Sequence, residues 1–183
     1  LEEKTSDLVK GNTVPDILAD SLIIAMIRLD EEAIDEILLR SVINRGFEDT
    51  FSLVVFPFLK KVGVMWHTGS VNVGTEHFIS NIFRRKLIAA FENLHLPHSR
   101  SSKKILMFLP ENEYHELGLL YWAYYVRNLG HQVLYLGQST PMNAALEASE
   151  EWNPDLIITG VLSGISVPDH DDFILKASNC FRG

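Results

Sequence analysis

The chain has 183 residues, of which 46% are hydrophobic, and its formal net charge is −8 at pH 7. This length and apolar content are enough to bury the core of one large domain or of two small ones. Because phosphate binding depends on clustered cations, an acidic chain whose longest Lys/Arg run is the triplet at residues 84–86 is not expected to form a nucleic-acid surface by itself.

The cysteine content and the hydropathy pattern bear on the compartment. Cys180 is the only cysteine, so an intramolecular disulfide is excluded, and this usage is typical of a reducing environment. No apolar run approaches the roughly 20 residues that a membrane helix needs, and no signal peptide opens the chain. We therefore expect a cytoplasmic protein, and Leu1 in place of Met indicates an excised fragment or a processed start.

The first part of the chain, residues 15–96, carries apolar side chains at helical spacing. Thr13, with Asp16 three residues later, predicts the start of a first helix. Asp30 predicts the cap of a second helix, which ends just before Gly46.

A third helix is expected from about residue 49 to residue 66, where Pro57 either kinks the helix or marks its true first turn. A fourth is expected over residues 73–94. Four helices of this length with short connections predict a helical bundle, which we assign to residues 1–96. The polar segment that follows has no periodicity, and we interpret residues 97–102 as a linker.

Residues 103–183 have a different hydrophobic pattern, in which short apolar runs alternate with segments of helical periodicity. Strands that are apolar on both faces and alternate with helices predict a parallel sheet in a doubly wound, Rossmann-like or flavodoxin-like α/β domain. Because a fourth strand would begin where the chain ends, we expect the C-terminal part of this domain to be missing. Strands are expected at residues 103–110, 132–137 and 155–162, and helices at residues 114–130 and 141–152.

A histidine and a glutamate follow the first expected strand, which ends at about Pro110. In open parallel sheets ligands bind beyond the carboxyl ends of the strands, so Glu113 and His115 fall in the expected site. His115 is a candidate metal ligand, and Glu113 is a candidate acceptor for its far ring nitrogen. Gly118 would let a helix or a ligand approach closely. The alternative is that both side chains only decorate the start of a helix.

The stretch EYHELG at residues 113–118 resembles the D/E-x-H-x-x-G fingerprint of cobalamin-binding domains. The resemblance implies that His115 replaces the cofactor's own base beneath cobalt. The family pattern continues with Ser-x-Leu after a 41-residue gap, which is residues 119–159 here, and Leu162 matches the leucine. Gly160 stands where the family has serine. Thr159 and Ser163 are therefore the candidates for the hydroxyl contact to the buried nucleotide base.

Trp66 is followed ten positions later by Glu76 and His77. This pattern resembles the MerR-type light-responsive repressors that bind adenosylcobalamin, in which a helical bundle covers the cofactor's upper face. The resemblance implies that Trp66 packs on the adenosyl group and that Glu76 and His77 contact this group or its surroundings. It also implies that His67 could reach cobalt after light removes the upper ligand. The alternatives are a core aromatic at 66, an exposed loop histidine at 67, and a helix cap and first turn at 76–77.

The two resemblances together predict a non-enzymatic sensor, the cobalamin-binding region of a light-dependent transcriptional repressor. Such a protein is expected to form homo-oligomers with adenosylcobalamin in the dark, and to bind DNA only through a preceding helix-turn-helix domain that is not in this chain. One alternative is a corrinoid carrier that shuttles methyl groups between methyltransferases. That role requires an exposed upper face, which a Trp and Glu-His cover would obstruct. A weaker alternative is a degenerate module that senses another ligand.

Overall fold

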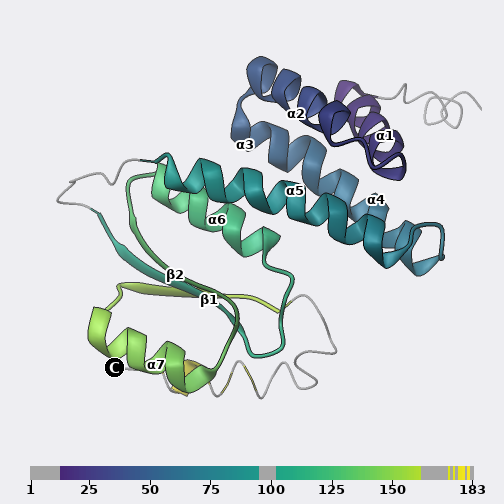
Figure 1. The fold of residues 1–183 in the computed structure, drawn as a ribbon. Coiled ribbons are helices and arrows are strands. Elements are labelled where there is room, and N and C mark those ends of the chain that lie inside the picture. The colour runs from purple at the N-terminus through teal and green to yellow at the C-terminus, as the bar shows by residue number, and fades with distance from the viewer. Residues whose placement is uncertain are drawn as a thin grey trace, which may run out of the picture. The chain divides into compact units, whose positions relative to one another are not determined.

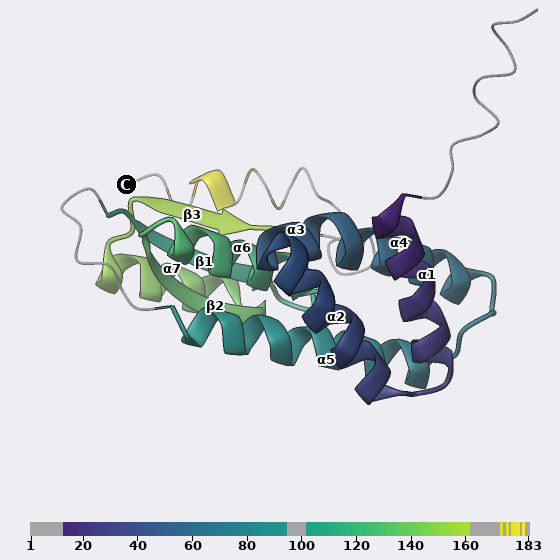
Figure 2. The same ribbon diagram turned by 90° about the horizontal axis from the view of Figure 1, so that it is seen from above.

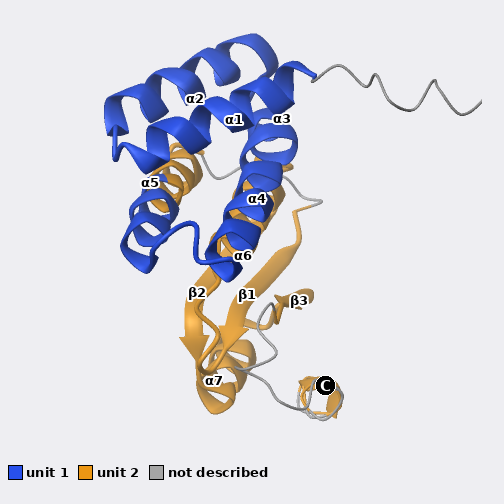
Figure 3. Ribbon diagram, turned by 90° about the vertical axis from the view of Figure 1, so that its right-hand side faces the viewer, with its two compact units in different colours: residues 1–82 blue, residues 83–183 orange. Residues whose placement is uncertain are grey.

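The computed structural model describes residues 13–94 and 102–161, together with residues 173, 175, 177–179 and 181. The chain divides into two compact units, residues 1–82 and 83–183 (Figure 3). Helix α5 (Val73–Glu92) crosses this division, so its first part belongs to unit 1 and its last turns belong to unit 2. None of the helices in the described part of the chain is long and apolar enough to span a membrane.

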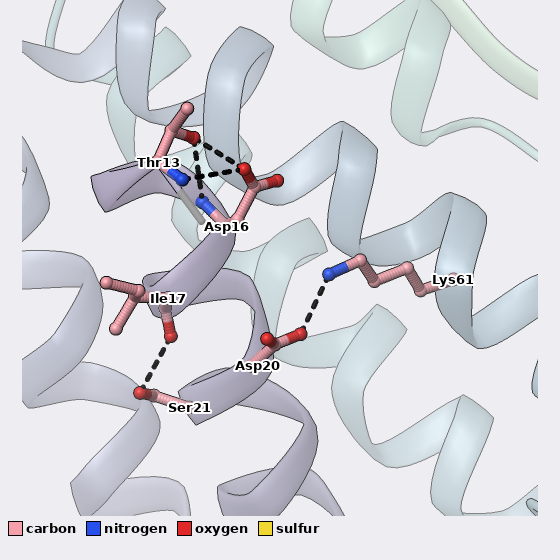
Figure 4. Close-up of polar contacts among 6 residues, drawn as sticks. All are labelled: Thr13, Asp16, Ile17, Asp20, Ser21 and Lys61. Atoms are coloured by element: carbon pink, nitrogen blue, oxygen red, sulfur yellow. Dashed lines mark hydrogen bonds and ion pairs between the residues drawn. The ribbon is translucent and has the colours of Figure 1, made fainter. Parts of the chain in front are cut away.

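Unit 1 is helical, and its helices start where local side chains supply caps (Figure 1). Thr13 and Asp16 form a capping box, in which the Asp16 N–H donates to Thr13 Oγ1 at 3.4 Å and the Thr13 N–H donates to Asp16 Oδ2 at 3.0 Å (Figure 4). The Asp30 carboxylate accepts from the Ala33 N–H at 3.0 Å, and Gly46 follows the second helix with φ +85°. Both predicted starts are confirmed. The helical segments are α1 (Val14–Ile27), α2 (Glu31–Arg45), α3 (Phe47–Thr50), η2 (Phe51–Val55), α4 (Phe56–His67) and α5 (Val73–Glu92).

Residues 47–67 form one continuous helical stretch with a π-helical turn, η2, in its middle. Proline has no N–H to donate to the carbonyl four residues earlier, so a regular α-helix cannot run undisturbed through Pro57. The Phe56 N–H donates instead to the Phe51 carbonyl, five residues back. Pro57 then lies in the first turn of α4, as one of the two sequence-based alternatives predicted.

The core of unit 1 is apolar, with polar links where its helices meet. Lys61 Nζ on α4 lies 2.8 Å from Asp20 Oδ1 on α1 (Figure 4). The buried hydroxyl oxygens of Ser41 and Thr50 lie 3.0 Å apart between α2 and α3, and the Thr50 hydroxyl donates to the Gly46 carbonyl at 2.7 Å. The fully buried apolar side chains include Leu22, Met26, Ile34, Val54, Phe58 and Ile79.

The described elements of unit 2 are β1 (Lys104–Pro110), α6 (Leu117–Asn128), β2 (Gln132–Thr140), α7 (Met142–Trp152) and β3 (Leu156–Thr159). Among these residues the strands form a three-stranded parallel sheet in the order β2-β1-β3, with β1 in the centre (Figure 2). Alternate residues of β1 face opposite sides of the sheet. Met107 and its neighbours on that face pack against α6 and against Phe91 from the end of α5. Phe108 packs on the other side against α7.

Helices on both faces of a parallel sheet, preceded by a helical unit, confirm the predicted fold class. The pairing of β1 with β2 shifts register twice, between Met107 and Phe108 and between Phe108 and Pro110. Such bulges re-aim the backbone at the end of a strand. Here they lie at the carboxyl end of the sheet, where the loop to α6 begins.

Candidate functional site

The loop at residues 111–116 connects β1 to α6 and is tied by its backbone to both neighbouring strands. The Glu113 N–H donates to the Pro110 carbonyl at 3.0 Å, and the Glu113 carbonyl accepts from the Ser139 N–H at 3.0 Å. The Asn112 N–H donates to Ser139 Oγ at 3.1 Å. These bonds hold the loop at the carboxyl edge of the sheet, where ligands bind in folds of this kind.

Glu113 and His115 are brought together by this loop. The Glu113 carboxylate is fully buried, and its Oε1 lies 2.6 Å from His115 Nδ1 while also accepting the His115 backbone N–H at 3.0 Å. The imidazole itself is 68% exposed. A carboxylate on Nδ1 favours the tautomer whose proton is on that nitrogen, which leaves Nε2 as the nitrogen that can bind a metal.

The carboxyl end of β3 and the start of α6 supply two further features. Thr159 ends β3 beside the central strand, and its Oγ1 is buried with no hydrogen-bond partner among the described residues. A buried hydroxyl without a partner is costly, so this atom is suited to bind a group from outside the described residues. A Cβ at Gly118 would meet no atom within 4 Å, so the space beside it is open. Leu162 and Ser163 lie outside the described residues.

Trp66 and His67 form the last turn of α4 in unit 1. Their ring centroids lie 5.0 Å apart at an interplanar angle of 61°. The Trp66 side chain is 47% exposed, so Trp66 is not a core aromatic. His67 is also exposed.

Glu76 lies in the first turn of α5, where a carboxylate is favoured by the helix dipole, and His77 follows it. The cap of this helix is Asn72, whose Oδ1 accepts from the Thr75 N–H at 2.9 Å, so the Glu76–His77 pair does not cap the helix. Glu76 Oε1 accepts from Ser80 Oγ at 2.6 Å, and Glu76 Oε2 lies 3.7 Å from His77 Nδ1. The described contacts of both residues are thus with close neighbours in their own helix.

A polar cluster around the buried carboxylate of Glu116 in unit 2 went unrecognised in the sequence. It consists of Arg84, Glu116 and Tyr135, and we call it the Glu116 cluster. The Arg84 guanidinium donates through Nε to Glu116 Oε1, and the Tyr135 hydroxyl donates to Glu116 Oε2 at 3.0 Å. The hydrogen bond to Glu116 raises the pKa of Arg84, and burial raises the pKa of Tyr135 with help from the Glu116 charge. Glu116 occupies a variable position of the fingerprint, so no motif singles it out.

Comparisons with known proteins agree with the resemblance predicted from the two motifs. Residues 18–90 match the protein family described as B12 binding domain. The chain is 30% identical to the HTH-type transcriptional repressor CarH of Myxococcus xanthus over 145 residues, which cover 79% of this chain and 46% of CarH. It is 27% identical to the HTH-type transcriptional repressor CarA of the same organism over 103 residues, which cover 56% of this chain and 33% of CarA. The chain thus spans less than half of the length of either relative.

Among solved structures, a novel cobalamin-binding protein from Desulfitobacterium hafniense DCB-2 is 21% identical to this chain, with a TM-score of 0.41. The alignment covers 89% of this chain and 78% of that protein.

Proposed function

We propose that this chain, whose residues 18–90 match the B12 binding domain family, is the cobalamin-sensing region of a transcriptional repressor. Its similarity to two HTH-type transcriptional repressors supports the regulatory role. The observation that carries the proposal is the contact between the buried Glu113 carboxylate and Nδ1 of the exposed His115, which prepares Nε2 for a metal.

The residues of unit 2 would suit a cofactor that brings its own metal, because His115 offers one nitrogen ligand. His115 would supply the ligand below cobalt, Glu113 would orient the imidazole, and the Thr159 hydroxyl would donate to the nucleotide base that His115 displaces. The open space beside Gly118 would admit a part of the cofactor. Leu162 and Ser163 complete this group of proposed contacts.

We propose adenosylcobalamin as the form that is bound. It supplies a cobalt–carbon bond that visible light breaks. The exposed Trp66 ring offers a flat surface for adenine, and the Glu76 carboxylate can accept hydrogen bonds from a ribose diol, with His77 beside it. His67, adjacent to Trp66, is the candidate to bind cobalt after photolysis.

Regulation would follow from assembly. In this proposal the protein forms homo-oligomers with adenosylcobalamin in the dark and dissociates in the light, while a helix-turn-helix domain outside this chain binds DNA. The role is non-enzymatic and cytoplasmic. A corrinoid methyl carrier is the competing function, and the upper face distinguishes the two because a carrier must present it to partner enzymes.

The test is to mix the purified protein with adenosylcobalamin in the dark, and to record its absorption spectrum and its sedimentation before and after green light. The proposal predicts the absorption spectrum of the His-on form, in which a protein histidine replaces the cofactor's own base as a cobalt ligand. It also predicts an oligomer in the dark and dissociation on illumination. Methylcobalamin in a parallel sample serves as the control, because it lacks the adenosyl group. A protein that stays monomeric in the dark and after light, with equal affinity for both cofactors, would favour the carrier.

A further inference from the structure

Glu116 is a buried carboxylate placed one residue after the candidate cobalt ligand. It sits at the N-cap position of α6, where an acidic side chain ordinarily accepts backbone N–H groups of the first turn. In this structure its side chain makes no such capping bond. Both oxygens are used instead by Arg84, from the unit 2 part of α5, and by Tyr135 on β2. The carboxylate therefore serves something other than the local stability of α6.

The two donors that hold Glu116 come from elements that pack on their neighbours. Tyr135 packs against the apolar cluster between the sheet and α6, so its hydroxyl has a defined position. Arg84 belongs to α5, whose last turns pack on α6 through the Arg127 guanidinium lying 4.4 Å from the centroid of the Phe91 ring. Glu116 is thus bound to one helix and one strand that flank the loop.

The backbone at Glu116 is bound as well. Its N–H donates to the Tyr114 carbonyl at 2.9 Å, and its carbonyl accepts from the Leu120 N–H at 2.8 Å. Glu113 holds the loop on the other side of His115 through its bonds to Pro110 and Ser139. His115 therefore lies between two buried carboxylates, of which Glu113 contacts its ring and Glu116 holds the backbone that follows it.

We propose that Glu116, held by Arg84 and Tyr135, is a positioning residue that fixes the direction in which His115 meets cobalt. This inference rests on the proposed function and deepens it by naming the residues that orient the lower ligand. An ion pair with a half-exposed partner adds little stability, but Arg84 and Tyr135 together bind both oxygens of the buried Glu116 carboxylate and so hold it in one position. A metal ligand needs one geometry.

The experiment compares Glu116→Gln with wild type in two states. In the cofactor-free protein, hydrogen exchange at the His115 amide reports how firmly the loop is held. With adenosylcobalamin in the dark, the absorption spectrum reports the fraction in the His-on form, and titration gives the affinity. We expect faster amide exchange and a smaller His-on fraction. The affinity should fall by up to about tenfold, the low end of the loss for partners that contact a metal ligand directly.

Asp155→Asn is the matched control. Asp155 pairs with Lys103 at 2.9 Å at the amino edge of the same sheet, far along β1 from the loop. It should leave the His-on fraction and the His115 exchange rate unchanged. Tyr135→Phe removes one hydrogen bond to Glu116 and keeps the ring, so it tests the same idea if Glu116→Gln fails to fold.

The two levels of the proposal fail separately. If His115→Ala has the same spectrum and affinity as wild type, the proposed function is wrong. If His115→Ala loses the His-on form while Glu116→Gln and Tyr135→Phe keep the wild-type His-on fraction, affinity and exchange rate, only the positioning role is wrong.

Discussion

The candidate lower site in unit 2 and the candidate upper residues in unit 1 are prepared very differently. The His115 ring contacts the buried carboxylate of Glu113, and the Glu113 backbone is hydrogen-bonded to β1 and β2. Trp66, His67 and His77 are exposed side chains, and their described contacts are with adjacent residues. The protein itself therefore holds the lower site in a defined conformation. The candidate upper residues only have side chains of suitable chemistry, at the end of α4 and near the start of α5.

The difference has a consequence for binding. A preorganised ligand loses little conformational freedom when it binds, so His115 should contribute most of the selectivity for a cobalt-containing cofactor. The exposed candidate upper residues lose more conformational freedom on binding. They should therefore contribute a smaller part of the binding free energy, and that part should depend on the cofactor's upper ligand. The following substitutions test this ranking, and they descend in expected effect.

His115→Ala should have the largest effect, because it removes the proposed cobalt ligand. The loss in affinity should exceed the roughly 10–100-fold that follows from losing an outer-shell partner, and the His-on spectrum should disappear. Titration with adenosylcobalamin in the dark measures both. The control is His131→Ala. His131 is another histidine of unit 2, and its Nδ1 accepts from the Lys103 N–H at 3.3 Å. An unchanged spectrum in His115→Ala would remove the basis of the comparison.

Glu113→Gln should have the next largest effect. The amide keeps the size of the side chain, but it weakens the interaction with Nδ1 and so lowers the basicity of Nε2. We expect a loss in affinity of roughly 10–100-fold with the fold retained. Glu111→Gln changes an exposed carboxylate in the same loop and should have no effect. Equal affinities for the two variants would mean that Glu113 only stabilises the loop.

Trp66→Ala should weaken adenosylcobalamin binding and dark oligomerisation by about 1–3 kcal/mol, through lost burial and stacking. Methylcobalamin, which has no adenine, should lose much less. Four affinities, from two cofactors and two proteins, give one coupling free energy. Trp122, 52% exposed against 47% for Trp66, provides the control substitution Trp122→Ala. A coupling free energy of zero would place Trp66 outside the cofactor site.

Thr159→Val should have the smallest effect on binding, about 0.5–1.5 kcal/mol for one lost hydrogen bond. The substitution should also change the stability of the cofactor-bound and the cofactor-free protein in opposite directions. Because Thr159 Oγ1 is buried without a described partner, its removal should leave the cofactor-free protein equally stable or more stable. Thermal unfolding with and without cofactor measures both signs. A loss of stability in the cofactor-free protein alone would show that the hydroxyl serves the fold.

Local chemistry explains which features the sequence predicted. Helix starts at Thr13 and Asp30 depend on side chains that bond within three residues, so the caps were predictable. The fold class followed from alternating strands and helices. The approach of Glu113 to His115 was also predictable, because two residues in one short loop can hardly lie far apart.

Features that depend on distant partners were not predictable. Glu116 contacts Arg84 and Tyr135 only because the fold brings α5 and β2 to the same loop. No spacing in the sequence predicts these contacts. The exposure of Trp66 likewise depends on how unit 1 packs, since an apolar residue at helical spacing is equally compatible with a core.

The central claim is that a histidine of this protein binds cobalt from below, and electron paramagnetic resonance tests it most directly. The protein is labelled with ¹⁵N only in histidine, loaded with unlabelled cobalamin, and reduced to the Co(II) form. A nitrogen ligand splits the cobalt lines into triplets if it is ¹⁴N and into doublets if it is ¹⁵N. The account predicts doublets, which His115→Ala should abolish. Triplets in the labelled protein would show that the cofactor keeps its own base, and they would contradict the account.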